Sequence, residues 1–344
     1  MEISKKLADN LTVIKEEIGG TKTFDLINRD FKIADKNVSL IFIDSFAKGD
    51  LLNKILEFLM KTKAEEISVD VIKKLLNNRL PILEVTVVDK IDDLIDEVLA
   101  GPQALLIEGI DQAIILDART WMSRTPAEPE LEKATRGPED GFVETMLFNL
   151  QMIRRRIRDP KLRAEAIKVG KRSQTDTCVV YIDDIADPEL VQDIKDRLHQ
   201  IDVDGLPLAD RTVEDYLVGD KFNPLPKVRY TNRADIASSH LLEGKICIIV
   251  DNSPTVLLLP ATLFDHTQTL EDYRQPPIPG TYINLLRLSS ILISLFLPAV
   301  WLLFAYNPEW LPEILQIIGP KEVGKIPLGF QFVLASIGID LIRI

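Results

Sequence analysis

Up to residue 261, segments with the apolar spacing of helices alternate with segments that have the apolar pattern of strands. Apolar residues three or four positions apart are typical of one face of a helix, whereas short runs rich in β-branched residues are typical of strands. The predicted helices cover residues 3–17, 50–60, 68–78, 91–101, 142–157 and 188–201. The predicted strands cover residues 38–44, 104–109, 113–118, 177–183, 245–251 and 255–261. Strands that alternate with helices indicate an α/β fold with mixed or parallel sheets rather than a sandwich.

A stretch rich in proline and charge, residues 125–141, interrupts this alternation. We therefore expect two α/β subdomains, residues 1–130 and 131–275, followed by a third region, residues 276–344. Gly101 is expected to end the helix before it, and the proline-rich residues 276–280 are expected to form a stiff elbow. No sequence repeat with a period of 20–50 residues is visible.

The third region has a different polarity. Residues 288–308 are 21 positions without a charge, which as a helix would span about 31 Å, close to the thickness of the hydrocarbon core of a bilayer. Pro298 is expected to kink this helix. Arg287 stands at one end and the amphipathic rings of Trp301, Tyr306 and Trp310 at the other, as is typical of a membrane anchor. The alternative is a buried helix of a large soluble domain.

A second apolar run covers residues 326–339 and is followed by Asp340 and Arg343. It is short for a complete span, so we expect a re-entrant or interfacial piece, or part of a second span over 326–344. The N-terminal residues are charged throughout and do not resemble a secretory signal peptide. We therefore expect the first 280 residues to be cytoplasmic.

The composition and net charge of the chain limit the kinds of molecule that it is expected to bind. The chain has 344 residues, 41 basic and 53 acidic, with a net charge of −12, so a general nucleic-acid binder is not expected. Residues 151–172 nevertheless contain nine basic and two acidic residues. This run is interpreted either as a solvated or internally paired face, or as a docking surface for anionic lipid headgroups or an acidic neighbouring protein.

The sequence lacks recognisable motifs for catalysis, metal binding or cofactor binding. Two cysteines and three scattered histidines do not form a ligand pattern, and glycine-rich phosphate loops are absent. Asp183 and Asp184 could lie at the edge of a metal site, but we interpret them as part of a turn and as the N-cap of the next helix. Asp265 could orient His266 for base catalysis, but no nucleophile accompanies them. We expect no cofactor and no metal.

Residues 115–162 resemble the signature of the GerA family of spore germination receptor proteins. That signature combines a tryptophan, a Glu-Pro pair, an Arg-Gly-Pro triplet, an asparagine and an arginine run. The matching positions are Trp121, Arg124, Glu128, Pro129, Arg136, Gly137, Pro138, Gly141, Phe142, Glu144, Asn149, Arg154, Arg155 and Arg156. A second block, residues 251–277, is similar to the segment that precedes the membrane in this family. Within it, residues 264–268 and 273–275 resemble the stage V sporulation protein AF branch.

The resemblance implies a cytoplasmic α/β region joined to a multi-helix membrane domain in the inner membrane of the bacterial endospore. It also implies homo-oligomers and association with other membrane subunits of a germination complex, with a part in germinant response and ion release. We expect Arg136 and Glu144 to form a structural or intersubunit ion pair. Two alternatives remain open: a membrane-anchored enzyme with a cleft between the subdomains, built on Asp183, Asp184 and His266, and a scaffold that conducts nothing.

Overall fold

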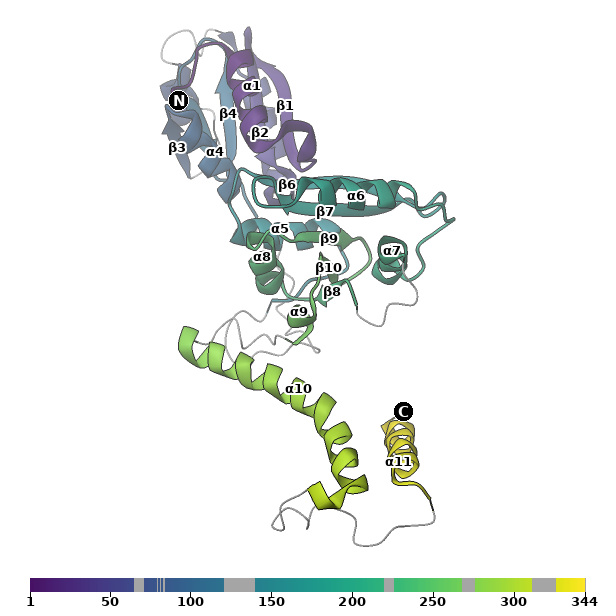
Figure 1. The fold of residues 1–344 in the computed structure, drawn as a ribbon. Coiled ribbons are helices and arrows are strands. Elements are labelled where there is room, and N and C mark those ends of the chain that lie inside the picture. Colours follow the sequence, from purple (N-terminus) through teal and green to yellow (C-terminus); the bar gives the residue numbers. More distant parts are fainter. Residues whose placement is uncertain are drawn as a thin grey trace. The chain divides into compact units, whose positions relative to one another are not determined.

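The computed structural model comprises two compact units, Met1–His266 and Thr267–Ile344. It describes residues 1–64, 71–78, 80, 82, 84–120, 140–219, 226–267, 276–310 and 326–343. The first unit contains two five-stranded sheets, each covered by helices (Figure 1). The described part of the second unit is mainly helical.

The first half of the first unit is built around a sheet with strand order β1-β2-β4-β5-β3. Its helices are α1 (Leu7–Ile18), α2 (Gly49–Met60), α3 (Val71–Asn78) and α4 (Ile91–Ala100). Its strands are β1 (Leu26–Ile33), β2 (Lys36–Ile43), β3 (Val85–Val88), β4 (Gln103–Ile107) and β5 (Ala113–Leu116), with two 3₁₀ turns, η1 (Gly20–Lys22) and η2 (Asp44–Phe46). One buried cluster joins α1 and α4 to one face of the sheet, and another joins α2 and α3 to the opposite face. The result is a three-layer arrangement with an apolar core on each side of the sheet.

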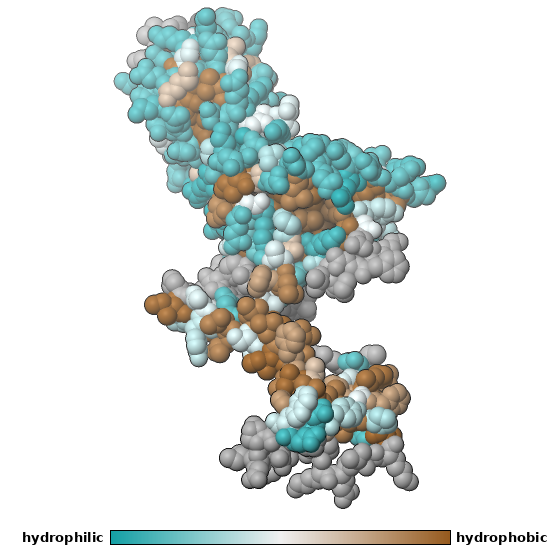
Figure 2. All heavy atoms as spheres, viewed as in Figure 1, coloured by the Kyte–Doolittle hydropathy of each residue, from teal (hydrophilic) through white to brown (hydrophobic). Residues whose placement is uncertain are grey.

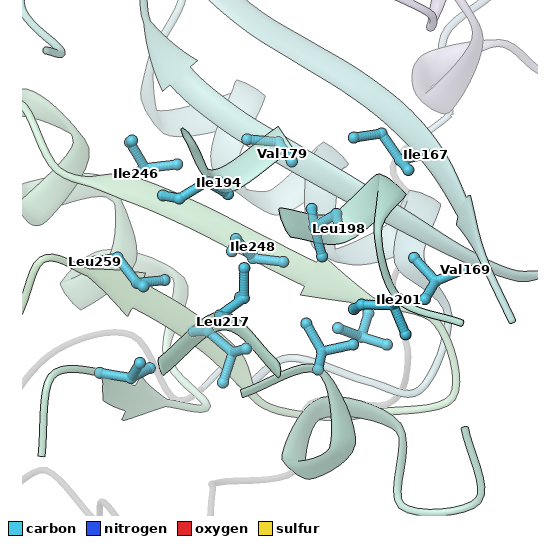
Figure 3. Close-up of a cluster of buried hydrophobic side chains, with 14 of the residues drawn as sticks. Ile167, Val169, Val179, Ile194, Leu198, Ile201, Leu217, Ile246, Ile248 and Leu259 are labelled. Carbon is cyan, nitrogen blue, oxygen red and sulfur yellow. The ribbon is translucent and has the colours of Figure 1, made fainter. Parts of the chain in front are cut away.

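The second half has the sheet order β6-β7-β9-β10-β8. Its helices are α5 (Met146–Arg156), α6 (Pro188–His199), α7 (Ala209–Val218), α8 (Ala234–Leu242) and α9 (Leu263–Thr267). Its strands are β6 (Leu162–Val169), β7 (Thr175–Ile182), β8 (Arg229–Thr231), β9 (Ile246–Val250) and β10 (Val256–Leu259). Figure 3 shows Ile194 and Leu198 of α6 and Leu217 of α7 packed on strand residues such as Ile248.

The two halves are copies of one fold. Both follow the order α-β-β-α-α-β-α-β-β, and their strand orders correspond position by position. In each, an asparagine four residues into the first helix bonds the backbone six residues earlier: Asn10 with Ser4 and Asn149 with Val143. We call these halves the first and second repeat. The repeat was missed in the sequence because its spacing, 139 residues between the two asparagines, is far outside the 20–50-residue range expected of short repeats.

Further backbone contacts match between the repeats. An acidic residue just after the central strand of each sheet accepts a hydrogen bond from the first residue of the first helix. Glu108 accepts from Leu7 at 3.2 Å, and Asp251 accepts from Met146 at 3.0 Å. These contacts satisfy backbone N–H groups that a helix start leaves without an internal partner.

The prediction of mixed or parallel sheets was wrong. Every strand pair in both sheets is antiparallel. Sequence patterning did not reveal the edge strands β1 and β6, which form hairpins with β2 and β7. Without these partners, each hairpin looked like a single strand between helices, the pattern typical of a parallel crossover. The elements β3, α7, β8, α8 and α9 were also not predicted.

Of the helix ends predicted from local sequence signals, one is confirmed and one is wrong. Gly101 ends α4 in the left-handed conformation, with φ of 114°, as expected. Helix α6 begins at Pro188, but its N-cap is Asp187, whose carboxylate accepts from the Glu189 backbone N–H at 3.0 Å. The cap is therefore neither Asp183 nor Asp184, which lie farther upstream.

The second unit contains α10 (Pro277–Tyr306), the 3₁₀ turn Pro308–Trp310 and α11 (Leu328–Arg343). Residues 277–280, expected as an elbow, instead form the first turn of α10, since proline is favoured at a helix start. Arg287 consequently lies inside this helix rather than before it. The helix continues through Pro298, and Figure 1 shows that it bends in its second half.

Within α10, residues Ile278–Tyr306 form an apolar span of 29 residues, and its most apolar part is not buried. Its exposed apolar side chains appear as a brown surface in Figure 2. Within the described ranges it is the one helix long and apolar enough to cross a bilayer, and α11 is shorter. The expected second span is therefore not confirmed.

Candidate functional site: the junction between the repeats

A buried ion pair joins the two repeats. Arg154, in the last turn of α5, donates from Nε to Oδ2 of Asp25 at 2.6 Å and from Nη2 to Oδ1 at 2.7 Å. The two side chains are 2% and 0% exposed. Two parallel charge-assisted bonds fix both distance and orientation. Because each charge would be stranded in the interior without the other, this pair ties the last turn of α5 to the residue before β1.

A second arginine closes the junction from the β6 side. Arg163 donates from Nη1 to the backbone oxygens of Ile18 and Pro160 at 2.8 and 2.6 Å. Its Nη2 lies 3.3 Å from Oδ2 of Asp183. The Ile18 carbonyl belongs to the C-terminal end of α1, where a cation is favourable.

Gly19 makes this approach possible. Its φ of 95° is left-handed, and an added Cβ would lie 2.4 Å from Cζ of Arg163. A side chain at this position would force the guanidinium to shift, so glycine permits the observed close approach as well as the left-handed backbone conformation.

Backbone contacts complete the junction. The Phe24 N–H donates to the Ala164 carbonyl at 3.1 Å, and Thr23 and Ala164 form a parallel bridge. Residues 23–25 thus add to the free edge of β6. On the other side, Gln151 of α5 donates to the Thr120 carbonyl at 2.9 Å.

One carboxyl group of the junction has a shifted pKa. Burial, and then the neighbouring Asp25 carboxylate, raise the pKa of Asp44. The Asp44 N–H donates to the Asp25 carbonyl at 2.8 Å, which places the two acids together.

The arginine run of the family signature contributes directly to this junction. Arg154 is its buried member, and Arg156 pairs with Asp140 at 2.7 Å. Arg155 is exposed. Farther along the basic run, Lys171 and Arg172 pair with Asp202 and Asp204. Internal pairing with acidic residues therefore accounts for much of this run, in agreement with the first of the two sequence interpretations.

Other signature residues hold the start of α5. Asn149 is fully buried; it accepts from the Val143 N–H at 2.8 Å and donates to the Val143 carbonyl at 2.6 Å. Phe142 is buried and its N–H donates to the Asn232 carbonyl at 2.7 Å. Gly141 forms an isolated antiparallel β-bridge with Arg233.

The Glu144 side chain is exposed, while its carbonyl accepts from the Asn252 N–H at 2.7 Å. Its expected partner Arg136 lies outside the described residues, so the ion pair between them stays a prediction. The remaining signature residues also lie outside them: Trp121, Arg124, Glu128, Pro129, Gly137 and Pro138. The same holds for residues 268 and 273–275 of the second block.

A second, largely buried ion pair holds the end of the first unit. Lys245 lies 2.5 Å from Oδ1 of Asp265, and the two side chains are 14% and 10% exposed. The other oxygen of Asp265 accepts from the N–H and hydroxyl of Thr262 at 2.6 and 2.8 Å. Burial alone would raise the pKa of Asp265, but these bonds and the Lys245 charge outweigh it and lower the pKa to about 2. We call this pair the α9 latch, because Asp265 lies in α9.

The residues considered for catalysis do not form one site. Asp265 pairs with Lys245 instead of orienting His266, whose Nε2 lies 3.2 Å from the Pro226 carbonyl oxygen. Asp183 contacts Arg163 and Lys22. Across the described parts of the chain, no contact joins Asp183 or Asp184 to His266, and no group of three or more metal-ligating side chains occurs.

The residues expected to anchor the chain in a membrane all fall in or just after α10. Arg287 donates to the Thr267 carbonyl at 2.7 Å. Trp301 is half-buried, whereas Tyr306 and Trp310 are exposed, and the Tyr306 hydroxyl accepts from the Gly329 N–H of α11 at 3.1 Å. The aromatic end of α10 is thus also its contact with α11.

Comparison with known proteins decides the family. The model of the Bacillus/Clostridium GerA spore germination protein family matches residues 12–344. The chain belongs to the GerA family. As a GerA protein it is 40% identical to stage V sporulation protein AF of Bacillus subtilis (strain 168) over 344 residues, which is all of this chain and 70% of that protein. It is 31% identical to spore germination protein GerLA of Bacillus cereus, over 100% of this chain and 70% of the relative.

A solved structure supports the fold of this GerA protein. The N-terminal domain of the A-type component of the Bacillus megaterium spore germinant receptor GerK3 superposes with a TM-score of 0.57 and 26% identity. The match covers 76% of this chain and 98% of that domain. The family assigned from the signature residues is therefore confirmed, and the higher of the two sequence identities agrees with the stage V sporulation protein AF branch. What the sequence did not indicate is Asp25, the buried partner of Arg154.

Proposed function

We propose that this GerA protein is a non-enzymatic membrane subunit of a spore germination complex. It assembles with copies of itself and with other membrane subunits of the complex, and it contributes to the germinant response and to ion release across the spore inner membrane. Its first unit lies on the cytoplasmic side. The observation that carries the proposal is the apolar span Ile278–Tyr306 of α10, whose 29 residues include no buried residue in their most apolar part. An exposed apolar surface of this length is costly in water and matches a bilayer.

The first unit supports a mechanical role. The Arg154–Asp25 pair and the Arg163 contacts join the two repeats into one body, since a small shift at the junction would separate buried charges. The α9 latch then fixes the end of this body immediately before the chain enters the second unit. A partner that moves this body as a whole would thereby act on the segment that leads to α10.

The alternative of a membrane-anchored enzyme is less well supported, because Asp183 and His266 are engaged in separate contacts. The alternative of a scaffold differs from our proposal in one measurable property, which is ion flux.

Reconstitution tests the proposal. The full chain is purified in detergent together with its co-isolated membrane subunits, and cation flux is recorded in proteoliposomes. We expect flux that depends on this chain and that falls when Leu292→Arg places a charge near the middle of α10. A conservative change at the same position, Leu292→Ile, is the matched control. Assembly without flux would instead establish the scaffold.

A further inference from the structure

The first repeat carries an open groove beside α1 and β1. A cavity of about 220 Å³ lies between them. We call it the α1–β1 groove; it is lined by Leu11, Ile14, Lys15, Gly20, Thr21, Leu26, Asn28 and Ile41. Its floor is apolar, one wall is the edge strand β1, and one cation stands at its rim.

The second repeat has structurally equivalent positions for six of the residues that line the groove. Aligning Asn10 with Asn149 aligns the helices, and the strand pairings Asn28–Ile41 and Ala164–Val180 align the hairpins. The equivalents of Leu11, Ile14 and Lys15 are then Leu150, Ile153 and Arg154. The equivalents of Leu26, Asn28 and Ile41 are Leu162, Ala164 and Val180. The apolar residues of the helix stay apolar, and a cation stands at the rim in both repeats.

In the second repeat this face is occupied. Residues 23–25 lie on it: Phe24 adds to the β6 edge through Ala164, and the Asp25 carboxylate binds Arg154. The covered side chains are 0–2% exposed. The structure therefore shows what such a face binds, namely an extended segment that adds to the strand edge and presents a carboxylate to the cation.

In the first repeat the corresponding face is uncovered. Leu11, Leu26 and Asn28 are only half-buried, and Lys15 is exposed. Among the described residues Lys15 makes no ion pair, and β1 has no strand partner on its outer side. An unpaired edge beside an apolar floor is a ready surface for strand addition.

We propose that the α1–β1 groove binds an extended segment of a partner protein that carries an aspartate or glutamate, with the carboxylate on Lys15 and the backbone along β1. A second copy of this chain cannot offer residues 23–25, because in each copy they are already bonded to its own second repeat through Ala164 and Arg154. We therefore assign the groove to a segment of a different protein. The assignment is independent of whether the chain conducts ions.

A peptide with the sequence of residues 18–26, IGGTKTFDL, is the probe, since this segment occupies the equivalent face. Its binding to the full chain in detergent is measured by fluorescence anisotropy. We expect saturable binding that weakens with salt, that is retained in Lys15→Arg and that falls about tenfold in Lys15→Glu. The matched control is Lys54→Glu, an exposed lysine of α2 on the opposite face of the sheet.

A second peptide in which the aspartate is replaced by asparagine should bind about tenfold more weakly to the wild-type chain. Absence of binding would overturn the proposal, as would equal binding of the two peptides or equal losses in Lys15→Glu and Lys54→Glu. Self-association of the chain that requires Lys15 and excludes the peptide would also overturn it, since the occupant would then be a second copy.

Discussion

Arg154 and Asp25 lie 129 positions apart in the chain and form a fully buried, two-bond ion pair, with Nε–Oδ2 and Nη2–Oδ1 distances of 2.6 and 2.7 Å. Among the ion pairs of the described residues, none that joins the two repeats is more deeply buried. We expect the pair to contribute less to net stability than to the specificity of the packing, because burying two charges offsets much of their attraction while separating them is costly.

Removal of one partner should therefore be strongly destabilising. Asp25→Ala leaves the Arg154 guanidinium buried without a counter-charge, and we expect the free energy of unfolding to fall by about 3–5 kcal/mol. Denaturant unfolding of the full chain in detergent measures this. The double variant Asp25→Leu/Arg154→Met should recover most of the loss. A loss below about 0.5 kcal/mol in Asp25→Ala, the size found for exposed pairs, would contradict the structural role.

The two equivalent asparagines should respond alike. Asn10 and Asn149 are both buried and each bonds an N–H and a carbonyl six residues earlier. Replacement by alanine leaves these backbone groups unsatisfied, so each change should cost about 1–3 kcal/mol. Hydrogen exchange should show faster exchange at Ser4 in Asn10→Ala and at Val143 in Asn149→Ala. Unchanged exchange at both sites would refute the assigned roles.

Alanine substitutions at two glycines with left-handed backbone conformations distinguish the cost of backbone strain from the cost of a steric clash. Gly19→Ala adds strain at φ 95° and drives a Cβ into the Arg163 guanidinium, whereas Gly219→Ala adds strain at φ 64° with no atom within 4 Å. Strain alone costs about 1 kcal/mol, so we expect Gly219→Ala to lose about that much and Gly19→Ala clearly more. Thermal unfolding of both variants checks the order. Equal losses would mean that Arg163 does not need its position in the junction.

The α9 latch should weaken in acid. The pKa of Asp265 is lowered from 3.8 to about 2 in the folded chain, so protons bind the unfolded state first as the pH falls. Its contribution to stability is complete above about pH 4 and is lost between about pH 4 and 2. Lys245→Met removes the pair, so the difference in unfolding free energy between wild type and variant should shrink over that range. A difference that stays constant from about pH 5 to 2 would contradict the latch.

Local signals in the sequence predicted much of the fold, and long-range relationships were not accessible to them. The apolar spacing of α4 and the stop at Gly101 depend on neighbours in the chain, so they were predicted within a residue or two. Strand β1 reads LINRDFKI, and its charged residues Arg29 and Asp30 are exposed at a sheet edge, where apolar patterning is weak. Missing it hid the hairpin with β2 and led to the wrong sheet type.

The candidate site shows the same limit. The arginine run was singled out in the sequence, and the structure gives Arg154 a buried partner and Arg156 a half-exposed one. Neither Asp25 nor the duplication of the fold could be inferred, because contacts across 129 residues and a repeat spaced by 139 residues leave no local pattern. In contrast, the apolar helix was visible because its signal is a single uninterrupted stretch of the chain.

The proposed role requires Ile278–Tyr306 to lie in lipid, and membrane extraction of the full chain tests this requirement. Membranes from cells that express the chain are washed with alkaline carbonate, which releases peripheral proteins, and are then treated with detergent. We predict that the chain stays in the carbonate pellet, that detergent releases it, and that a variant lacking residues 278–306 moves to the wash. A full-length chain that appears in the carbonate wash and stays monodisperse without detergent would contradict the proposed role.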